Sequence, residues 1–178
     1  MTRKQVHNLL AAAEYARTIG RPLNRFTTIH WQAGGLVGDY QGATLRFLKL
    51  ARDWLRLRGE SLTYIWVRES GEGIGEHVHI LMHVPPHLAR QFSNRQRGWL
   101  QACDATFRKG VISSRPVGRN YRHALKGVQY GERYRDHLAN VLAYVLKGER
   151  EFAGELSGKR CSTSQNIGRK ARRGWPNP

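Results

Sequence analysis

The chain has 178 residues, which suggests one domain with a substantial core, and 40% of them are hydrophobic, an ordinary share for a soluble globular protein. Lysine and arginine number 30 against 13 acidic residues, and the formal charge of +17 indicates a polyanionic partner, nucleic acid rather than a membrane surface, because no long basic amphipathic helix stands out. Two cysteines without a C-x-x-C spacing argue against a disulfide framework or a cysteine zinc site, and no apolar run suits a signal peptide or a membrane span, so we expect a cytoplasmic protein.

The N-terminal part of the chain alternates between helical and strand patterns. Apolar residues at helical spacing predict one helix over residues 4–18 and a second over residues 40–58. Between them, the β-rich segment 25–31 (RFTTIHW) predicts a first strand. The residues expected in the buried stripe of the second helix are Leu45, Leu48, Trp54 and Leu55.

The centre of the chain has the pattern of a β-hairpin. Residues 62–69 (LTYIWVRE) and 77–84 (HVHILMHV) are both rich in β-branched and aromatic side chains. The connecting segment SGEGIGE contains three glycines, which is a strong turn signal. We therefore expect two adjacent antiparallel strands.

The rest of the chain adds a helix over about 87–108, a short strand near 111–115 and a final helix over about 132–148. Together with the hairpin, this order favours an α+β fold in which helices flank a central antiparallel β-sheet. We expect the domain to span residues 1–153, and residues 154–178, rich in Gly, Ser, Lys and Arg, to form a basic, flexible tail.

Two histidines mark the second strand of the hairpin. His77 and His79 lie two residues apart, so their side chains point to the same face with Cα atoms about 6.6 Å apart. Two imidazoles on one face of a rigid strand can share a metal ion, although the pair alone is equally compatible with a solvated polar face. The side chains expected on the opposite, buried face are Val78, Ile80, Met82 and Val84.

Glu69 is the expected third ligand. In a regular hairpin it lies across the ladder from His77, within reach of the imidazoles. One carboxylate with two imidazoles suits Mg²⁺ or Mn²⁺. Glu76 competes for this role but should point to the other face, and His83 lies about 13 Å from His79, too far to share an ion, which suggests a structural role or a substrate contact.

Tyr144 lies on the final predicted helix beside its apolar stripe. At 100° per residue, His137 and Asn140 fall within about 40° of Tyr144, and Lys147 about 60° away. A phenol can attack phosphorus to form a phosphotyrosine ester, and a neighbouring lysine can position the phosphate or promote ionisation of the phenol. The alternative is a boundary tyrosine whose hydroxyl reaches water, with Lys147 as a favourable charge at the helix end.

These residues resemble the signature of the HUH endonuclease superfamily, in which two histidines flank a hydrophobic residue, as in residues 77–79 (HVH). The Tyr-x-x-Lys motif of its single-tyrosine replication initiators (Rep) matches residues 144–147 (YVLK), and residues 26–29 (FTTI) loosely match its first strand motif. In these initiators a Glu on the strand before the histidines completes the metal site, and Glu69 occupies that place. The ordered set covers roughly residues 24–148.

This resemblance implies a ferredoxin- or RRM-like nuclease fold that nicks single-stranded DNA at a specific site. Tyr144 would form a 5′-phosphotyrosine intermediate, Lys147 would assist, and a Mg²⁺ or Mn²⁺ ion on His77, His79 and Glu69 would orient the phosphate. Attack by a free 3′-hydroxyl would rejoin DNA, so the enzyme would also be a strand transferase. Such proteins start rolling-circle replication of plasmids and phages. A single tyrosine in the motif means that termination would need a second subunit or another nucleophile.

Other interpretations remain open at this point. A transposase or relaxase of the same superfamily would share the chemistry. A non-catalytic, RRM-like module could stack bases on Tyr64 or Trp66, and a metal-dependent nuclease could use activated water while Tyr144 is structural. Tyr130 and Tyr134 are reserve nucleophiles, but Tyr134 lies about 280° around the helix from Tyr144.

Further DNA contacts are expected from His137 and Asn140 beside the tyrosine. The tail should add salt-sensitive affinity that does not depend on DNA sequence, unless it is only a solvated end. Its basic residues are Lys159, Arg160, Arg169, Lys170, Arg172 and Arg173.

Overall fold

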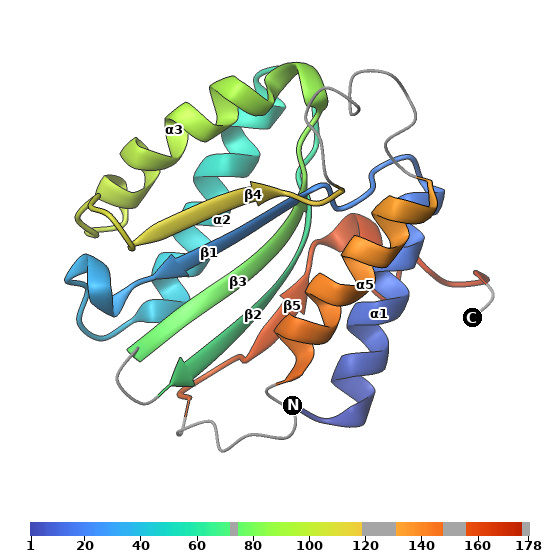
Figure 1. The fold of residues 1–178 in the computed structure, drawn as a ribbon, viewed down its shortest axis with the longest axis horizontal. Coiled ribbons are helices and arrows are strands. Elements are labelled where there is room, and N and C mark those ends of the chain that lie inside the picture. Colours follow the sequence, from blue (N-terminus) through green and yellow to red (C-terminus); the bar gives the residue numbers. More distant parts are fainter. Residues whose placement is uncertain (72–74, 119–130, 148–155, 176–178) are drawn as a thin grey trace.

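The structure, a computed structural model, describes residues 1–71, 75–118, 131–147 and 156–175 (Figure 1). Within these residues, a single five-stranded antiparallel sheet has the strand order β4-β1-β3-β2-β5, and α-helices pack on both of its faces. The predicted α+β class with a central antiparallel sheet is therefore confirmed. No helix in the described part of the chain is both long and apolar enough to span a membrane.

The elements follow one another in nearly the predicted order. Their bounds are α1 Arg3–Thr18, β1 Arg25–His30, α2 Tyr40–Arg56, β2 Thr63–Gly71, β3 Gly75–His83, α3 Ala89–Ala102, β4 Ile112–Pro116, α5 Glu132–Leu146 and β5 Cys161–Thr163, with short 3-10 helices at Gln32–Gly34, Pro86–Leu88 and Gln165–Ile167. From β1 to β4 this is the β-α-β-β-α-β order of ferredoxin-like folds.

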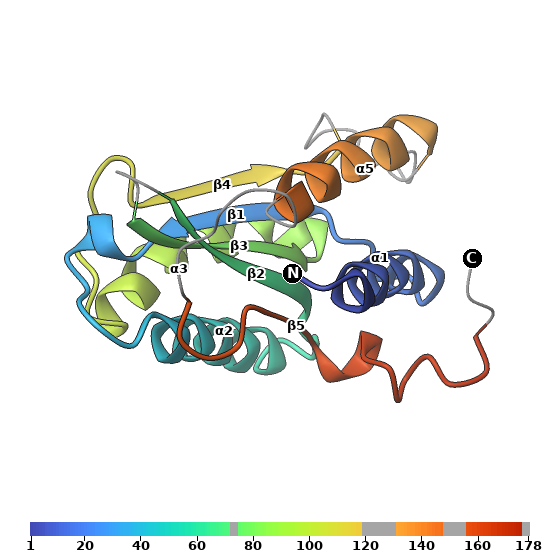
Figure 2. The same cartoon turned by 90° about the horizontal axis from the view of Figure 1, so that it is seen from below.

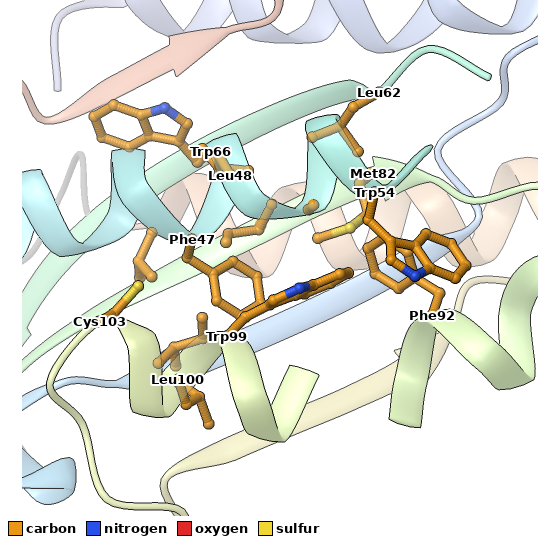
Figure 3. Close-up of a cluster of buried hydrophobic side chains, with 14 of the residues drawn as sticks. Phe47, Leu48, Trp54, Leu62, Trp66, Met82, Phe92, Trp99, Leu100 and Cys103 are labelled. Carbon is orange, nitrogen blue, oxygen red and sulfur yellow. The ribbon is translucent and has the colours of Figure 1, made fainter. Parts of the chain in front are cut away.

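One face of the sheet is covered by α2 and α3, as Figure 2 shows. Its core contains alternate residues of β3, such as Val78 and Ile80, because successive side chains of a strand point to opposite faces. Aromatic rings from the two helices meet edge to face above the sheet (Figure 3). Members of this aromatic cluster are Phe47, Trp54, Phe92 and Trp99.

The other face is covered by α1 and α5 over part of its length. The small side chains of Ala12, Ala13 and Ala16 let α1 approach the sheet closely, and Leu138 and Leu142 carry the buried stripe of α5. At the end of this face near the β2–β3 turn, the strands present polar side chains instead of apolar ones. The candidate functional site occupies that end.

Two helix predictions need correction. Leu45, expected in the buried stripe of α2, is 45% exposed, because the stripe runs through Ala43, Phe47 and Ala51 instead. The helix expected over 87–108 ends at Ala102, where Asp104 takes a positive φ of 61° that the helix cannot continue.

The C-terminal segment also differs from the flexible tail that its composition predicts. Within it, β5 pairs with β2, and the side chains of Cys161 and Ile167 are buried against the sheet and α1. Two polar side chains reinforce this docking. Ser164 accepts a hydrogen bond from the backbone of Tyr64, and Asn166 donates one to Thr63. The described part of this segment thus completes the sheet edge left open by β2.

Candidate active site

Glu69, His77 and His79 converge on one point of the α1/α5 face. Antiparallel pairing of β2 and β3 places Glu69 directly opposite His77, as the hairpin predicted. The Oε2 atom of Glu69 lies 3.6 Å from Nε2 of His77 and 3.5 Å from Nε2 of His79. One ligand atom from each of the three residues lies within 4.8 Å of the others, a spacing compatible with a shared metal ion.

The far side of each imidazole ring is held by a hydrogen bond. The Nδ1–H of His77 donates to the carbonyl of Gly75 at 3.1 Å, and Nδ1 of His79 pairs with the hydroxyl of Thr28 at 2.9 Å. Gly75 has a φ of 72°, and a Cβ there would collide with the side chain of Gln32, so only glycine fits. These bonds turn both Nε2 atoms towards Glu69, the arrangement that orients histidines as metal ligands.

Two buried polar atoms at this point have no hydrogen-bond partner among the described residues. They are Nε2 of His79 and Oε1 of Glu69. Burying a polar atom without a partner is costly, and a metal ion accepts electron pairs from both atom types. The donor set of two imidazoles and one carboxylate also fits a divalent cation. The three residues therefore form a candidate metal centre.

The charges of the centre favour the ligand form of Glu69. Burial by itself would raise the pKa of this carboxyl, but the adjacent imidazoles of His77 and His79 outweigh burial and lower it to about 2. For His77, burial lowers the pKa, but the interaction with Glu69 raises it by more. Glu69 is thus ionised at neutral pH and ready to bind a cation.

Tyr144 stands beside the candidate metal centre. Its ring lies 5.4 Å from the ring of His79 and 6.4 Å from that of Phe26, measured between centroids, and its side chain is 49% exposed. The Nζ atom of Lys147 lies 4.6 Å from the centre of the same ring. The structure therefore brings Tyr144 and Lys147, from the end of α5, next to a histidine of β3.

Sequence reasoning missed two residues of the site, Thr28 and His30. Both lie on β1, paired opposite His79 and His77 respectively. The ring of His30 stacks on that of His77 at 5.1 Å, and burial together with the charges of the two histidines lowers the pKa of His30. The alternation in FTTIH, which places every second residue on one face, was the available signal.

Several other candidates lie away from the centre. Glu76 points to the opposite face, where it pairs with Arg68, as its position in the strand predicted. His83 is buried, and its Nδ1–H donates to the carbonyl of Pro22 at 2.9 Å, which indicates a structural role. Tyr134 is 1% exposed and its hydroxyl donates to the carbonyl of Leu23 at 3.3 Å. Tyr130 lies outside the described residues.

The predicted DNA-contacting residues are divided between two places. On α5, Asn140 is exposed, whereas His137 is half-buried and accepts a hydrogen bond from the backbone of Gly118 at 2.8 Å. The basic residues after β5 lie beside α1, where two of them bond to Asn8, and not at the metal centre. These basic residues are Arg169, Lys170, Arg172 and Arg173.

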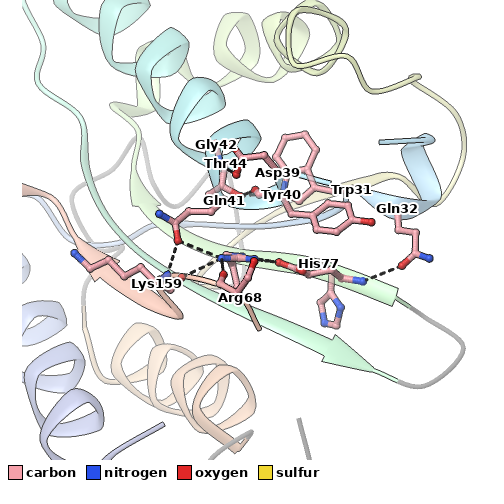
Figure 4. Close-up of polar contacts among 12 residues, drawn as sticks. Trp31, Gln32, Asp39, Tyr40, Gln41, Gly42, Thr44, Arg68, His77 and Lys159 are labelled. Atoms are coloured by element: carbon pink, nitrogen blue, oxygen red, sulfur yellow. Dashed lines mark hydrogen bonds and ion pairs between the residues drawn. The ribbon is translucent and has the colours of Figure 1, made fainter. Parts of the chain in front are cut away.

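On the reverse side of the hairpin, Arg68 ties the site to the rest of the fold (Figure 4). It is 1% exposed, and its Nε donates to Glu76 at 2.6 Å. Its Nη1 reaches Gln41 of α2 at 3.3 Å and the carbonyls of Ser157 and Lys159 at 3.0 and 3.2 Å. A buried charge satisfied in this way holds the strands that carry the candidate ligands against α2 and the C-terminal segment.

The aromatic residues of the passive-module alternative are not placed for stacking. Trp66 is 1% exposed in the core under α2, and Tyr64 is partly buried on the same face, where burial raises its pKa. Neither ring is available as a platform for bases on an open sheet face. The site on the other face thus remains the chemically distinctive part of the molecule.

Comparison with known proteins gives one match. No curated protein and no solved structure matches the chain significantly. One family model covers residues 25–149, from the start of β1 to just beyond Lys147, and so includes every residue of the candidate site. This match extends over well more than half of the chain, and the chain belongs to the family of replication-associated proteins named for ORF2 and the gene 2 protein.

Proposed function

We propose that this protein nicks single-stranded DNA in a metal-dependent reaction in which Tyr144 becomes covalently linked to the DNA. Membership of a replication-associated family implies DNA binding and a role in replication. Within that role, the proposed reaction starts rolling-circle replication of a plasmid or phage. The supporting observation is the position of the Tyr144 ring, 5.4 Å from His79, whose buried Nε2 has no hydrogen-bond partner in the described chain.

The protein residues have separate tasks in this proposal. Glu69, His77 and His79 hold a Mg²⁺ or Mn²⁺ ion, which when bound neutralises the non-bridging oxygens of the scissile phosphate and orients it. Thr28 and the carbonyl of Gly75 fix the rings of the two histidines. Lys147, close to Tyr144, binds the phosphate or stabilises the charge that develops on it.

The covalent step exchanges one phosphoester for another. The phenolic oxygen of Tyr144 attacks the phosphorus and loses its proton to solvent, while the bond from phosphorus to the 3′ oxygen breaks. The leaving 3′ oxygen takes up a proton, so the products are a 5′-phosphotyrosine and a free 3′-hydroxyl. Because the linkage keeps a phosphoester bond, attack by a 3′-hydroxyl can reverse the step and transfer the strand.

An adduct assay tests the proposal. The protein is incubated with single-stranded DNA carrying the origin of its replicon and Mn²⁺, and a denaturation-resistant protein–DNA adduct is measured on a gel. Tyr144→Phe should abolish the adduct and leave DNA affinity nearly unchanged, because only the attacking oxygen is removed. Tyr134→Phe is the matched control, since this buried tyrosine has no access to DNA, and it should retain the adduct.

The outcomes separate the competing functions. An adduct that persists in Tyr144→Phe contradicts the assignment of the nucleophile. Cleavage without any adduct favours hydrolysis by activated water, and binding without cleavage favours a passive module. An adduct that forms on the ends of a transposable element or a transfer origin, and not on a replication origin, would keep the chemistry and assign a transposase or relaxase.

A further inference from the structure

A cationic groove lies between the N-terminal half of α1 and the segment that follows β5. Its volume is about 400 Å³. In the described chain it shares no lining residue with the candidate active site. Its principal lining residues are Lys4, His7, Asn8, Arg169, Arg172 and Trp175.

Two guanidinium groups in this groove are held close together without a counter-ion. Arg169 donates to Oδ1 of Asn8 at 3.3 Å, and Arg172 donates to the same oxygen and to the carbonyl of Ile167 at 3.1 Å. Among the residues that the structure describes, no carboxylate pairs with either arginine. Burial and the neighbouring charge of Arg169 both lower the pKa of Arg172, as expected for two cations that share a neutral acceptor. A bound anion would offset their repulsion.

The shape and chemistry of the groove suit a nucleic-acid backbone. Each arginine has five N–H donors in a planar fork, and the bonds to Asn8 and Ile167 use only some of them. Guanidinium groups bind phosphate oxygens through paired, charge-assisted hydrogen bonds. Trp175 supplies a partly exposed ring at the edge of the groove, with its position set by an edge contact to Tyr15 at 5.5 Å. Cations beside an aromatic ring are the combination by which proteins bind single strands.

We infer that this groove is a second binding site for single-stranded DNA, which holds phosphates of the strand outside the cleavage site. The identification of the polyanion as single-stranded DNA rests on the proposed function. Val6, Leu10 and Ala13 face α5, whereas Lys4 and His7 line the groove, so α1 separates the groove from Tyr144. Loss of the groove should therefore weaken DNA binding without removing the chemistry of cleavage.

Charge removal at the groove is the first test. In a Tyr144→Phe background and without divalent metal, fluorescence anisotropy measures the affinity of fluorescein-labelled oligothymidylate over a range of salt concentrations. Arg169→Gln with Arg172→Gln should weaken binding roughly tenfold and lower the salt slope by about 0.7 for each phosphate that is no longer bound. Lys4→Glu should weaken binding in the same direction, and it changes an exposed side chain that the fold does not need.

A second pair of arginines gives a matched control. Arg90 and Arg95 are exposed on α3, on the opposite side of the sheet, and Arg90→Gln with Arg95→Gln removes the same charge. This pair should keep the affinity within about twofold and leave the salt slope unchanged, because it touches no bound phosphate. Equal reductions of affinity for the two pairs would mean that only net charge matters, and would overturn the inference.

Trp175 provides a direct optical test. The other four tryptophans are at most 8% exposed, so quenching of tryptophan fluorescence by iodide reports mainly on Trp175. Saturating oligothymidylate should protect Trp175 from iodide, and Trp175→Phe should remove most of the quenchable signal. Unchanged iodide quenching at saturation would also overturn the inference.

Failure of the groove and failure of the proposed function give different results. A protein that forms no adduct with single-stranded DNA, yet loses affinity when Arg169 and Arg172 are changed, keeps the groove and loses the nicking reaction. A protein that forms adducts normally but whose affinity does not depend on these two arginines keeps the reaction and loses the groove.

Discussion

The two faces of the sheet use the same strands for different ends. Towards α2 and α3, β3 contributes Val78 and Ile80 to a core closed by aromatic rings. Towards α1 and α5, the same strand contributes His77 and His79, with two polar atoms of the site buried and unpaired among the described residues. One face therefore supplies stability that tolerates an unsatisfied cluster on the other, as is common where function requires polar groups inside a fold.

The largest expected effect breaks this comparison from the stable side. Phe92 is 0% exposed between Trp54 and Trp99, so Phe92→Ala should lower the free energy of unfolding by about 3–5 kcal/mol in urea titrations. The folded fraction should still bind Mn²⁺ with its original affinity, because no candidate ligand touches the cavity. A matching fall in the Mn²⁺ affinity of folded Phe92→Leu, the milder change, would contradict the separation of the two faces.

The next effect comes from Arg68, which lies on the core face but directly behind the candidate ligands. Arg68→Met should lower the free energy of unfolding by about 3 kcal/mol, because Glu76 is left without its cationic partner. Hydrogen exchange should also become faster at the amide of Arg68, which donates to the carbonyl of Arg160. Arg68→Met with Glu76→Gln should recover part of the stability. A double variant as unstable as the single one would show that the contacts to the C-terminal segment dominate.

On the polar face, the metal should change the sign of the contribution. At about 100 times its dissociation constant, Mn²⁺ should raise the free energy of unfolding of the unmodified protein by about 2.7 kcal/mol, and His79→Ala should remove this gain. Thr28→Val, which leaves the ligands in place but frees the ring of His79, should weaken Mn²⁺ binding about tenfold in calorimetry. Mn²⁺ affinity unchanged in His79→Ala would refute the metal centre.

The smallest effect concerns pH and His83, buried on the polar face beyond the site. Burial lowers the pKa of His83 below 6.5, its usual value, which also applies to the unfolded chain. The unfolded chain therefore takes up this proton first as pH falls, so the contribution of His83 is complete above about pH 6.5 and is lost on acidification below it. His83→Asn, whose amide can still donate to Pro22, should flatten the stability profile between pH 7 and 5. An unchanged slope would contradict this role.

Local sequence signals predicted the hairpin and its ligands well. The glycine turn fixed the pairing of Glu69 with His77, and helical phase placed Tyr144 and Lys147 on one side of α5. What the sequence could not show depends on contacts between distant segments. The position of Thr28 opposite His79 requires the register of β1 on β3.

The C-terminal strand illustrates the same limit. A three-residue strand with the sequence CST carries no periodic signal, and only the open edge of β2 and the buried Cys161 give it a place. Leu45 failed for a related reason, since an apolar residue at the border of a helical stripe can face either the core or water. Composition alone could not distinguish a docked basic segment from a free one.

The short chain distance between the candidate ligands has a kinetic consequence. Glu69, His77 and His79 all belong to one hairpin, whereas Tyr144 reaches them only after α5 docks. Hairpins close within microseconds, long before contacts between remote segments form. We therefore expect the ion to be captured early during synthesis, before the nucleophile is in place. The cation would then act as a nucleus for folding, and the chain would become reactive only at the last step of its assembly.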